Sequence, residues 1–513
     1  MSLINKDAGY FYKNTLLSLA LIGILSFVIR MYYFPYNIPV TEDGWLYFRY
    51  AIDASLLGHL PNTPLINNGW PLLLSIFFST LHSPNFLDYV ELQRLVSISI
   101  SVLTIIPVYL LIRRFFVSKY ALFGALMFAI EPRTMSNSLL GITEPLYIFL
   151  VTTILYLLFS GKMRTIYFSF ALVAVTMQIR YEAVMLVFVN SIAFFGIFGK
   201  KRDTVVKYGL AIGLFFLVLI PMEYIRTVTY GDINNGKTAV FTGAMVYGRQ
   251  ASSYSDNIAY GVFQYVTNGL VALVKYLGWI TIPYYVIFMP IGFYLLIKNR
   301  STNRTITILT IAILLAPALY AYSRGIQETR YLYVLYPIFS IISVYCIKFF
   351  SEKRKEIFYV GITVVLISSI LFMNYKAIDN NHEREAFEIA KYVSKYAKTV
   401  NSYYPESRYL AVSNIDNNFP VTSNLIPNGV KEVNTNFQSL TEFINSGKKE
   451  GLDYIVVDDK KDRVPYLVDL FNDDSKYPYL IKKFDSKDFG FVYHVKMYKI
   501  DYQKFASNDT RNA

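Results

Sequence analysis

The chain has 513 residues, of which 54% are hydrophobic and 17% are charged, and its mean hydropathy is +0.35. A soluble enzyme of this length would be less apolar and more charged. The formal charge of +13 does not indicate a nucleic-acid partner, because the Lys and Arg residues cluster in short loops between apolar segments rather than in a basic stripe with interleaved aromatics. The composition therefore predicts a membrane protein.

Apolar segments long enough to span a bilayer, about 20 residues each, recur through the first 375 positions. The first, about 14–34, carries Arg30 and is followed by no small-residue cleavage site, which predicts an uncleaved helix rather than a signal peptide. Ten further spans are expected at about 94–115, 120–135, 143–160, 164–180, 183–198, 208–224, 276–297, 305–322, 331–349 and 356–374. We therefore expect a polytopic α-helical membrane protein with about eleven transmembrane helices.

Basic residues in alternate loops predict the orientation, because loops rich in Lys and Arg stay in the cytoplasm. Loops rich in Lys and Arg lie after the spans that end near 115, 160, 198, 297 and 349. Residues 35–93, in contrast, contain Arg49 as their only Lys or Arg residue. The N-terminus is therefore predicted to be cytoplasmic. The segments predicted to lie outside are 35–93, 136–142, 225–275, 323–330 and 375–513.

Two helical segments are expected inside the first outer loop. Trp45–Leu60 has amphipathic helical spacing and should lie at the membrane surface. Gly69–Leu81 is apolar but short for a span, and counting it as one would invert every later loop. We therefore predict that it is re-entrant or lies in the interface.

Charged residues return after about position 375, where the chain is expected to form a second domain. Short apolar runs alternate there with helix-like stretches, which predicts a small α/β domain. The runs are Tyr409–Val412, Tyr454–Val457 and Val492–Tyr498, and the helical stretches include Glu383–Tyr396 and Ser439–Gly447. The chain is thus divided into a transmembrane domain, 1–375, and an extracytoplasmic α/β domain, 376–513. Asp458 and Asp459 follow a predicted strand and are interpreted as a turn or solvated edge.

A single cysteine, Cys346, lies within an apolar run. It excludes an intramolecular disulfide, so the extracytoplasmic domain must fold without one.

Three carboxylates lie on the predicted outer face. Glu42 and Asp43 follow the first span, and Glu144 lies at the start of the span 143–160. Acidic side chains near a bilayer are costly and are usually retained for a task. Asp43 or Glu42 would serve as a general base toward a hydroxyl group, or would help to hold a divalent ion. The competing interpretation is structural, because Glu and Asp also favour the first turn of a helix, and Thr143 would cap a helix opened by Glu144 and Pro145.

Arg180 and Arg330 are the basic residues best placed to neutralise a phosphate group. Each lies at a predicted membrane boundary beside a Tyr, and guanidinium groups bind phosphate bidentately. The alternative is that each pairs with a neighbouring carboxylate, Glu182 for Arg180 and Glu328 for Arg330. Lys237, in a predicted outer loop, is a further candidate for the same task.

His59 and Tyr47 lie near Asp43 in the sequence and are candidate contacts of a substrate or a metal ion. A lone His is more often structural than a ligand. The histidines form no visible cluster with metal-ligand spacing; they are His59, His82, His382 and His494. A permanent structural metal site is therefore not expected, and the identity of any catalytic metal is left open.

Several motifs follow one another in a characteristic order on one predicted side of the membrane. They are Asp43, Tyr47, Ala51 and Gly58; Asn68-Gly69-Trp70-Pro71-Leu72; Arg94-Leu95-Val96-Ser97 with Arg113-Arg114; Pro132 through Glu144; and Arg180-Tyr181-Glu182 with Arg330-Tyr331. With these motifs, residues 1–375 resemble the GT-C superfamily of membrane glycosyltransferases. The chain looks most similar to the protein O-mannosyltransferase and aminoarabinose transferase group, glycosyltransferase family 39 and its relatives.

The resemblance implies transfer of a sugar from a polyprenyl (dolichyl) phosphate donor to a hydroxyl acceptor on a protein, glycan or lipid, with inversion and a single base. In such enzymes the first-loop acid is the base, which implies this role for Asp43 with Glu42 as the alternative. Glu144 would contribute to the acceptor or metal side. Arg330, Arg180 or Lys237, or a divalent metal, would stabilise the departing phosphate. The aromatic-rich loop 225–275 would cover the site.

The chain also departs from the family pattern. Its acidic pair reads Glu-Asp where Asp-Glu is the commoner order, so the acting carboxylate is open between Glu42 and Asp43. The Trp-Trp-Asp motif of oligosaccharyltransferases is absent from the C-terminal domain, which argues against transfer of a whole glycan to Asn. The β-trefoil insert of eukaryotic protein mannosyltransferases is absent too, so a protein acceptor does not follow from the resemblance.

Two functions from other classes compete with this interpretation. A transporter or flippase of lipid-linked sugars would place ionisable residues and broken helices near the bilayer midplane, and it would often contain an internal repeat. The acids here lie at one face and no repeat is evident, which favours surface chemistry. A non-catalytic scaffold, the other alternative, would keep its function if the acidic residues Glu42, Asp43 and Glu144 were substituted. The resemblance favours a prokaryotic plasma membrane as the location.

Overall fold

The structure is a computed structural model, and it describes residues 2–40, 42–65, 67–83, 85–230, 258–298, 301–376, 379–401 and 431–512. Internal contacts divide the chain into two units. The helical unit comprises Met1–Phe34, Leu46–Phe77 and Leu92–Ala377. The second unit comprises Pro35–Trp45, Phe78–Glu91 and Ile378–Ala513.

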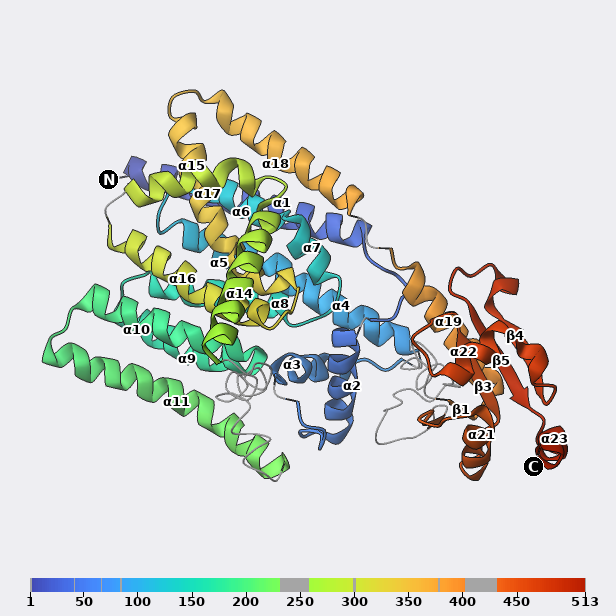
Figure 1. The fold of residues 1–513 in the computed structure, drawn as a ribbon. Helices are drawn as coiled ribbons and strands as arrows, with labels where there is room; N and C mark the ends of the chain where they lie inside the picture. Colours follow the sequence, from blue (N-terminus) through green and yellow to red (C-terminus); the bar gives the residue numbers. More distant parts are fainter. Residues whose placement is uncertain are drawn as a thin grey trace. The chain divides into compact units, whose positions relative to one another are not determined.

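Helices account for most of the described residues up to residue 375 (Figure 1). In chain order they are α1 (Ser2–Tyr32), α2 (Glu42–Leu57), α3 (Gly69–Phe78), α4 (Phe86–Leu103), α5 (Ile105–Ile112), α6 (Ser118–Ala129), α7 (Pro132–Ser138), α8 (Glu144–Leu158), α9 (Met163–Ile179), the 3-10 helix η1 (Tyr181–Val184), α10 (Met185–Phe198), α11 (Arg202–Tyr230), α14 (Ile258–Thr281), α15 (Tyr285–Lys298), α16 (Thr302–Ser323), the 3-10 helix η3 (Thr329–Leu335), α17 (Tyr336–Ser351) and α18 (Glu356–Tyr375).

Within the described residues, seven helices are long and apolar enough to cross a membrane, or eight if one bent pair counts as a single span. Helices α3, α8 and α9 are apolar but shorter, with 10, 15 and 17 residues. At about 1.5 Å per residue they measure roughly 15–26 Å, less than the hydrocarbon core of about 30 Å. The polytopic helical fold is confirmed, whereas the expected number of eleven spans stays a prediction.

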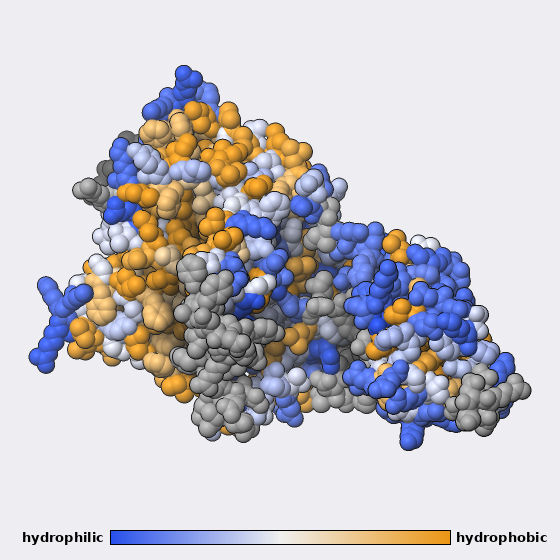
Figure 2. All heavy atoms as spheres, viewed as in Figure 1, coloured by the Kyte–Doolittle hydropathy of each residue, from blue (hydrophilic) through white to orange (hydrophobic). Residues whose placement is uncertain are grey.

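The surface of the helical unit is suited to lipid. Large apolar side chains stand exposed along α1, α11 and α18, such as Leu21 at 58%, Leu217 at 68% and Leu371 at 63%. Figure 2 shows hydrophobic side chains over much of the visible face of this unit and mainly hydrophilic ones over the C-terminal unit. Water would disfavour so much exposed apolar area, whereas acyl chains solvate it.

The two ends of the helical unit differ in the segments that they carry. Figure 1 shows the start of α1 and the α10–α11 and α17–α18 turns at one end, and the C-terminal ends of α1, α11 and α18 at the other. The α10–α11 turn contains Lys200 and Lys201, and the α17–α18 turn contains Lys353, Arg354 and Lys355. This arrangement agrees with the alternation of base-rich and base-poor loops in the sequence. Which end faces the cytoplasm stays a prediction.

Two segments in the middle of the chain differ from the expected continuous helix and loop. The predicted span 276–297 is not one straight helix, because α14 ends at Thr281 and α15 begins at Tyr285 at an angle of 111°; whether the bent pair spans the membrane stays a prediction. Most of the described part of the predicted loop 225–275 is helical, since α11 continues to Tyr230 and α14 starts at Ile258. Residues 231–257 of that loop lie outside the described residues.

Side chains from other helices cover the carbonyl groups that this bend exposes. Arg133 donates to the carbonyl oxygens of Ile282 and Trp279, the latter at 2.7 Å, and the Tyr336 hydroxyl donates to that of Ile280 at 3.1 Å. A break inside a lipid-embedded helix is tolerated only when such partners replace the lost backbone bonds. Arg133 and Tyr336 thus stabilise the bend.

Helices α15 and α17 pack closely where Gly292 meets the backbone of α17. A Cβ atom on Gly292 would collide with the carbonyl oxygen of Ile342, whereas a Cβ on Gly278 in α14 would meet nothing within 4 Å. Gly292→Ala is therefore expected to destabilise the protein by about 1–3 kcal/mol through overpacking. Gly278→Ala is the matched control and should be neutral or stabilising by up to about 1 kcal/mol. Thermal unfolding of the two purified variants measures the difference, and equal stabilities would contradict the close approach.

The C-terminal unit alternates helices and short strands, which confirms the predicted α/β character of this region (Figure 1). Its elements are α19 (Asn381–Tyr396), β1 (Thr399–Asn401), β2 (Lys431–Val433), α21 (Leu440–Lys449), β3 (Tyr454–Asp458), α22 (Pro465–Asn472), β4 (Leu480–Asp485), β5 (Val495–Ile500) and α23 (Tyr502–Asn512). Strands β1 and β2 pair in parallel, and β3, β5 and β4 form an antiparallel sheet in that order.

The core of this unit shows why these segments fold. Ile455 and Val457 of β3 pack with Phe443 and Ile444 of α21 and with Leu467 of α22, all at most 2% exposed. The expected helices near 383–396 and 439–447 and the strands near 454–457 and 492–498 are found as α19, α21, β3 and β5. The strand expected at 409–412 lies outside the described residues.

Asp458 precedes the turn after β3 and is buried, so of the two interpretations the solvated edge is wrong for this residue. It is 2% exposed, and Arg463 holds it bidentately, with Nε 3.0 Å from Oδ1 and Nη2 2.9 Å from Oδ2. Asp459 is exposed, as expected. A buried carboxylate needs such a partner, and the pair fixes the turn after β3.

Candidate functional site

Glu144 is the centre of a charged cluster at one end of the helical unit. It is the first residue of α8 and only 2% exposed, and Pro145 follows it at a position where proline favours helix initiation. The expected capping by Thr143 is wrong, because that side chain makes no cap hydrogen bond and instead donates to Glu144 Oε2 at 3.3 Å. The carboxylate is therefore oriented toward other side chains rather than toward its own helix.

Arg180 is the principal partner of Glu144. It ends α9 in an extended conformation, and its Nη1 lies 2.6 Å from Glu144 Oε1 while Nη2 lies 2.8 Å from Glu182 Oε1. The guanidinium carbon also lies 5.7 Å and 5.4 Å from the ring centroids of Tyr147 and Tyr331. The expected alternative, pairing of Arg180 with Glu182, is present, but Glu144 shares the same guanidinium.

Arg330 approaches Glu144 from the opposite side. It lies in η3, with Nε 3.8 Å from Glu144 Oε1 and 3.5 Å from Glu328 Oε2. The side chain is 26% exposed, against 13% for Arg180. Arg330 is thus the more accessible guanidinium of the two.

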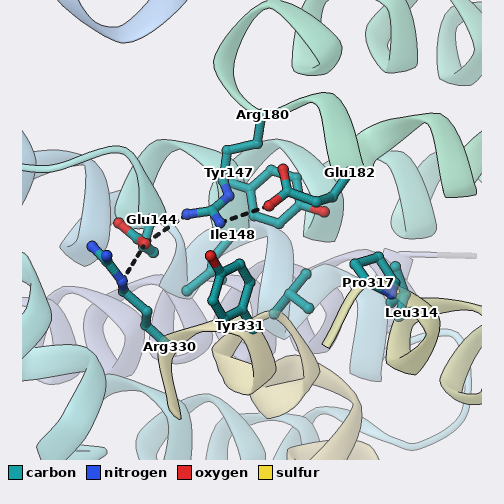
Figure 3. A pocket seen from close by; sticks show the side chains of 10 residues that line it. Glu144, Tyr147, Ile148, Arg180, Glu182, Leu314, Pro317, Arg330 and Tyr331 are labelled. Atoms are coloured by element: carbon teal, nitrogen blue, oxygen red, sulfur yellow. Dashed lines mark hydrogen bonds and ion pairs between the residues drawn. The ribbon is translucent and has the colours of Figure 1, made fainter. Parts of the chain in front are cut away.

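These residues line one pocket (Figure 3). Its charged lining residues are Glu144, Arg180, Glu182 and Arg330, and the others are Tyr147, Ile148, Leu314, Pro317, Tyr331 and Val334. The buried Glu182 Oε2 has no hydrogen-bond partner among the described residues. The cavity is small in this structure, about 20 Å³, which is space for a water molecule.

The first-loop candidates occupy α2 and the turn after it. Asp43 is half-buried in the first turn of α2. Glu42 is the first residue of this helix, but its side chain lies outside the described part of the chain. Lys237 lies entirely outside the described residues. Tyr47 is half-buried, and His59 is exposed with Nδ1 2.9 Å from the carbonyl oxygen of Leu60. Asp43 belongs to the second unit and Glu144 to the helical unit, so their expected pairing across a shared site stays a prediction.

A second polar cluster was not expected from the sequence. Arg226 is 2% exposed, its Nη1 lies 2.6 Å from Glu223 Oε1, and its Nη2 donates to Asn68 Oδ1. Asn68 in turn donates to the Tyr50 hydroxyl at 3.2 Å. The only sequence signal was Asn68 at the head of the motif Asn68-Gly69-Trp70-Pro71. The cluster connects α2, the segment before α3, and α11.

Arg30 forms another buried polar group near the end of α1. Its guanidinium donates to Ser138 Oγ at 3.1 Å, to the Ala129 carbonyl oxygen at 2.9 Å and to Ser101 Oγ at 3.0 Å. The sequence marked Arg30 only as a charge within the first span. These hydrogen bonds join α1 to α4, α6 and α7, which indicates that Arg30 has a structural role.

Comparison with known proteins agrees with the predicted family. Residues 89–225 match the family model described as dolichyl-phosphate-mannose-protein mannosyltransferase. The oligosaccharyltransferase of Archaeoglobus fulgidus, in complex with Zn and sulfate, is 12% identical with a TM-score of 0.54, over 86% of this chain and 68% of that chain. The archaeal oligosaccharyltransferase AglB from Archaeoglobus fulgidus, in complex with an inhibitory peptide and a dolichol-phosphate, is 11% identical with a TM-score of 0.55, over 91% of this chain and 72% of that chain.

The chain has the GT-C fold of membrane glycosyltransferases. This confirms the fold class and the resemblance drawn from the sequence motifs. ArnT from Cupriavidus metallidurans bound to undecaprenyl phosphate is also similar, at 12% identity and a TM-score of 0.49, over 78% of this GT-C chain and 68% of that chain. No curated protein sequence matches the chain significantly.

Proposed function

We propose that this chain transfers a sugar from a polyprenyl phosphate donor to a hydroxyl acceptor at the outer face of a membrane. The observation that carries the proposal is the pocket in which buried Glu144 lies near both Arg180 and Arg330, with tyrosine and aliphatic side chains in the same lining. The GT-C fold and the dolichol-phosphate complex of the similar archaeal protein support it. Residues 1–375 would be the catalytic domain in a prokaryotic plasma membrane, and residues 376–513 an extracytoplasmic domain.

Arg330 and Arg180 would hold the donor phosphate. When the bond between the anomeric carbon and the phosphate oxygen breaks, negative charge develops on that oxygen, and guanidinium groups stabilise it. Glu144 and Glu182 would orient Arg180. Lys237 would join them as a further donor contact.

Asp43 would act as the general base. It would take the proton of the acceptor hydroxyl while the hydroxyl oxygen attacks the anomeric carbon, and polyprenyl phosphate would leave on the opposite side with inversion. Glu42 is the alternative base, and Tyr47 and His59 would contact the sugar or the acceptor. The acceptor would be a hydroxyl of a protein, a glycan or a lipid.

A divalent metal does not enter the proposed steps. Among the described residues no group of three or more His, Cys, Asp or Glu could hold a metal ion. Glu144, the best candidate ligand in the pocket, already faces Arg180 at 2.6 Å and Arg330 at 3.8 Å. These residues do not fit a permanent metal site. An EDTA comparison in the assay below tests for a transiently bound ion.

The competing flippase function is less well supported. The buried residues Arg30, Glu144, Arg180 and Arg226 lie at or within about one turn of a helix end, whereas buried Arg94 lies in the middle of α4 and donates to the Leu139 carbonyl oxygen. The bend between α14 and α15 is a broken helix of the kind a transporter would use. Its exposed carbonyl groups, however, are occupied by Arg133 and Tyr336.

Sugar release from a radiolabelled polyprenyl-phosphate hexose or pentose by the purified chain tests the proposal, with and without EDTA. Arg330→Gln is expected to raise the donor KM by about ten- to a hundredfold, because it removes one charge-assisted contact of roughly 1.5–3 kcal/mol. The matched control is Arg324→Gln, which removes the same charge from the same segment outside the pocket. Wild-type protein that turns over no donor, or equal KM values in the two variants, would contradict the proposal.

A further inference from the structure

A second pocket lies at the opposite end of α17 from Glu144. It is lined by Arg113, Arg114, Phe115, Phe116, Val117, Tyr120, Lys348 and Glu352. Three of these side chains are cationic and one is anionic. The loop between α5 and α6 supplies the two arginines, and the last turn of α17 supplies Lys348.

The cations of this pocket are weakly neutralised by the protein itself. Lys348 Nζ is 3.9 Å from Glu352 Oε1, and both side chains are substantially exposed, so their pairing contributes little. Arg113 Nη1 donates to the carbonyl oxygen of Phe116 at 2.8 Å, which orients the guanidinium without cancelling its charge. The pocket therefore keeps a net positive charge that an anion would offset.

Arg114 adds a buried donor to this site. Its guanidinium carbon lies 4.6 Å from the ring centroid of Tyr156, and its Nε is buried with no hydrogen-bond partner among the described residues. Helix α6 begins at Ser118, directly after the pocket residue Val117, so the partial positive charge of a helix N-terminus lies at the same place. These features favour an acceptor group with several oxygens, such as a phosphate.

The position of the pocket favours a lipid as the source of that phosphate. The segment Thr329–Ser351 is long and apolar enough to cross a membrane; Arg330 lies at its first turn and Lys348 in its last. α17 alone, with 16 residues, measures about 24 Å. Val117, at 62% exposure, and Phe349, at 40%, present apolar surface next to the cations. A headgroup bound here would place its acyl chains along such surface.

We propose that this pocket binds the phosphate headgroup of an anionic membrane lipid on the face opposite the Glu144 site. Basic pockets between transmembrane helices have the chemistry that anionic headgroups require. The arginines would contact the phosphate oxygens and Lys348 would contribute a mobile charge. The bound lipid would connect the α5–α6 loop to the end of α17 and so stabilise the helical unit from that face.

Binding of a fluorescent phosphatidic acid to the full-length purified chain in neutral detergent tests the proposal. The double variant Arg114→Gln with Lys348→Gln is expected to bind the probe at least about tenfold more weakly than wild type. Arg113→Gln with Lys348→Gln, which changes two exposed side chains, provides a second variant that preserves the Tyr156 contact. The matched control is Lys200→Gln with Lys201→Gln, an equal charge loss at the exposed α10–α11 turn, with less than about twofold effect expected.

Competition identifies the source of the phosphate. Excess unlabelled phosphatidic acid should displace the probe, whereas phosphatidylcholine and inorganic phosphate should not. Displacement by inorganic phosphate would assign the pocket to a soluble anion and overturn the lipid proposal. Equal losses in the pocket variants and in the Lys200 and Lys201 control would show a general surface-charge effect and overturn it too.

Discussion

Asp43→Asn is expected to lower the rate of sugar transfer by about 10²–10⁴-fold, which is the usual contribution of a general base. Asparagine keeps the size and the helix-initiating character of Asp43 but cannot accept the acceptor proton. Donor affinity should change little, because the proposed phosphate contacts come from Arg180 and Arg330. Single-turnover transfer from a radiolabelled polyprenyl-phosphate sugar, with donor binding measured separately, checks both quantities.

Glu42→Gln is the matched control for this experiment, since the two carboxylates are adjacent in the chain. If Asp43 is the base, Glu42→Gln should retain transfer within about tenfold of wild type. The reverse ranking of the two variants would move the role to Glu42. Full activity in both would remove the acidic pair from the mechanism.

Glu144→Gln is expected to abolish transfer and to destabilise the protein by roughly 3 kcal/mol. The reason is that Arg180, 13% exposed, would lose a carboxylate partner at 2.6 Å and keep its own buried charge. The matched control, Glu328→Gln, removes a 52% exposed carboxylate 3.5 Å from Arg330 and should cost less than about 1 kcal/mol. Thermal unfolding and donor turnover of both variants measure the two effects.

A multiple variant separates stability from catalysis at this position. Arg180→Met in a Glu144→Gln, Glu182→Gln background removes the guanidinium together with both of its carboxylate partners, so it should recover part of the lost stability without restoring transfer. If it restored transfer as well, the charges of this cluster would serve the fold and not the reaction. If neither variant altered stability, the short contact between Glu144 and Arg180 would not exist in the membrane.

The members of the site were predictable one by one, but their geometry was not. Glu144, Arg180 and Arg330 were each singled out because each lies at a predicted membrane boundary. The pairing of each arginine with its neighbouring Glu follows from local spacing. That both arginines meet on Glu144 depends on how α8, α9 and η3 pack, and one sequence carries no signal of that packing.

The errors in the prediction have related causes. Hydropathy gives the total apolar length of 276–297 but not its direction, so the bend after Thr281 was missed. Its stabilising partners, Arg133 and Tyr336, are distant in the sequence. Likewise the contacts of Arg226 with Asn68 and Glu223 required the tertiary structure. The motif order, by contrast, was sufficient to predict the GT-C fold.

The bend between α14 and α15 has a consequence for how the chain is assembled during synthesis. Its carbonyl groups are covered by Arg133, which is translated about 150 residues earlier, and by Tyr336, which is translated about 50 residues later. When α14 and α15 enter the bilayer, the first partner is already in place but the second is still inside the ribosome. When α14 and α15 first insert into the bilayer, the Ile280 carbonyl therefore lacks the hydrogen bond from Tyr336. Ribosome-stalled chains that stop before residue 336 should accordingly be more accessible to protease near 281–284 than chains that continue past α17.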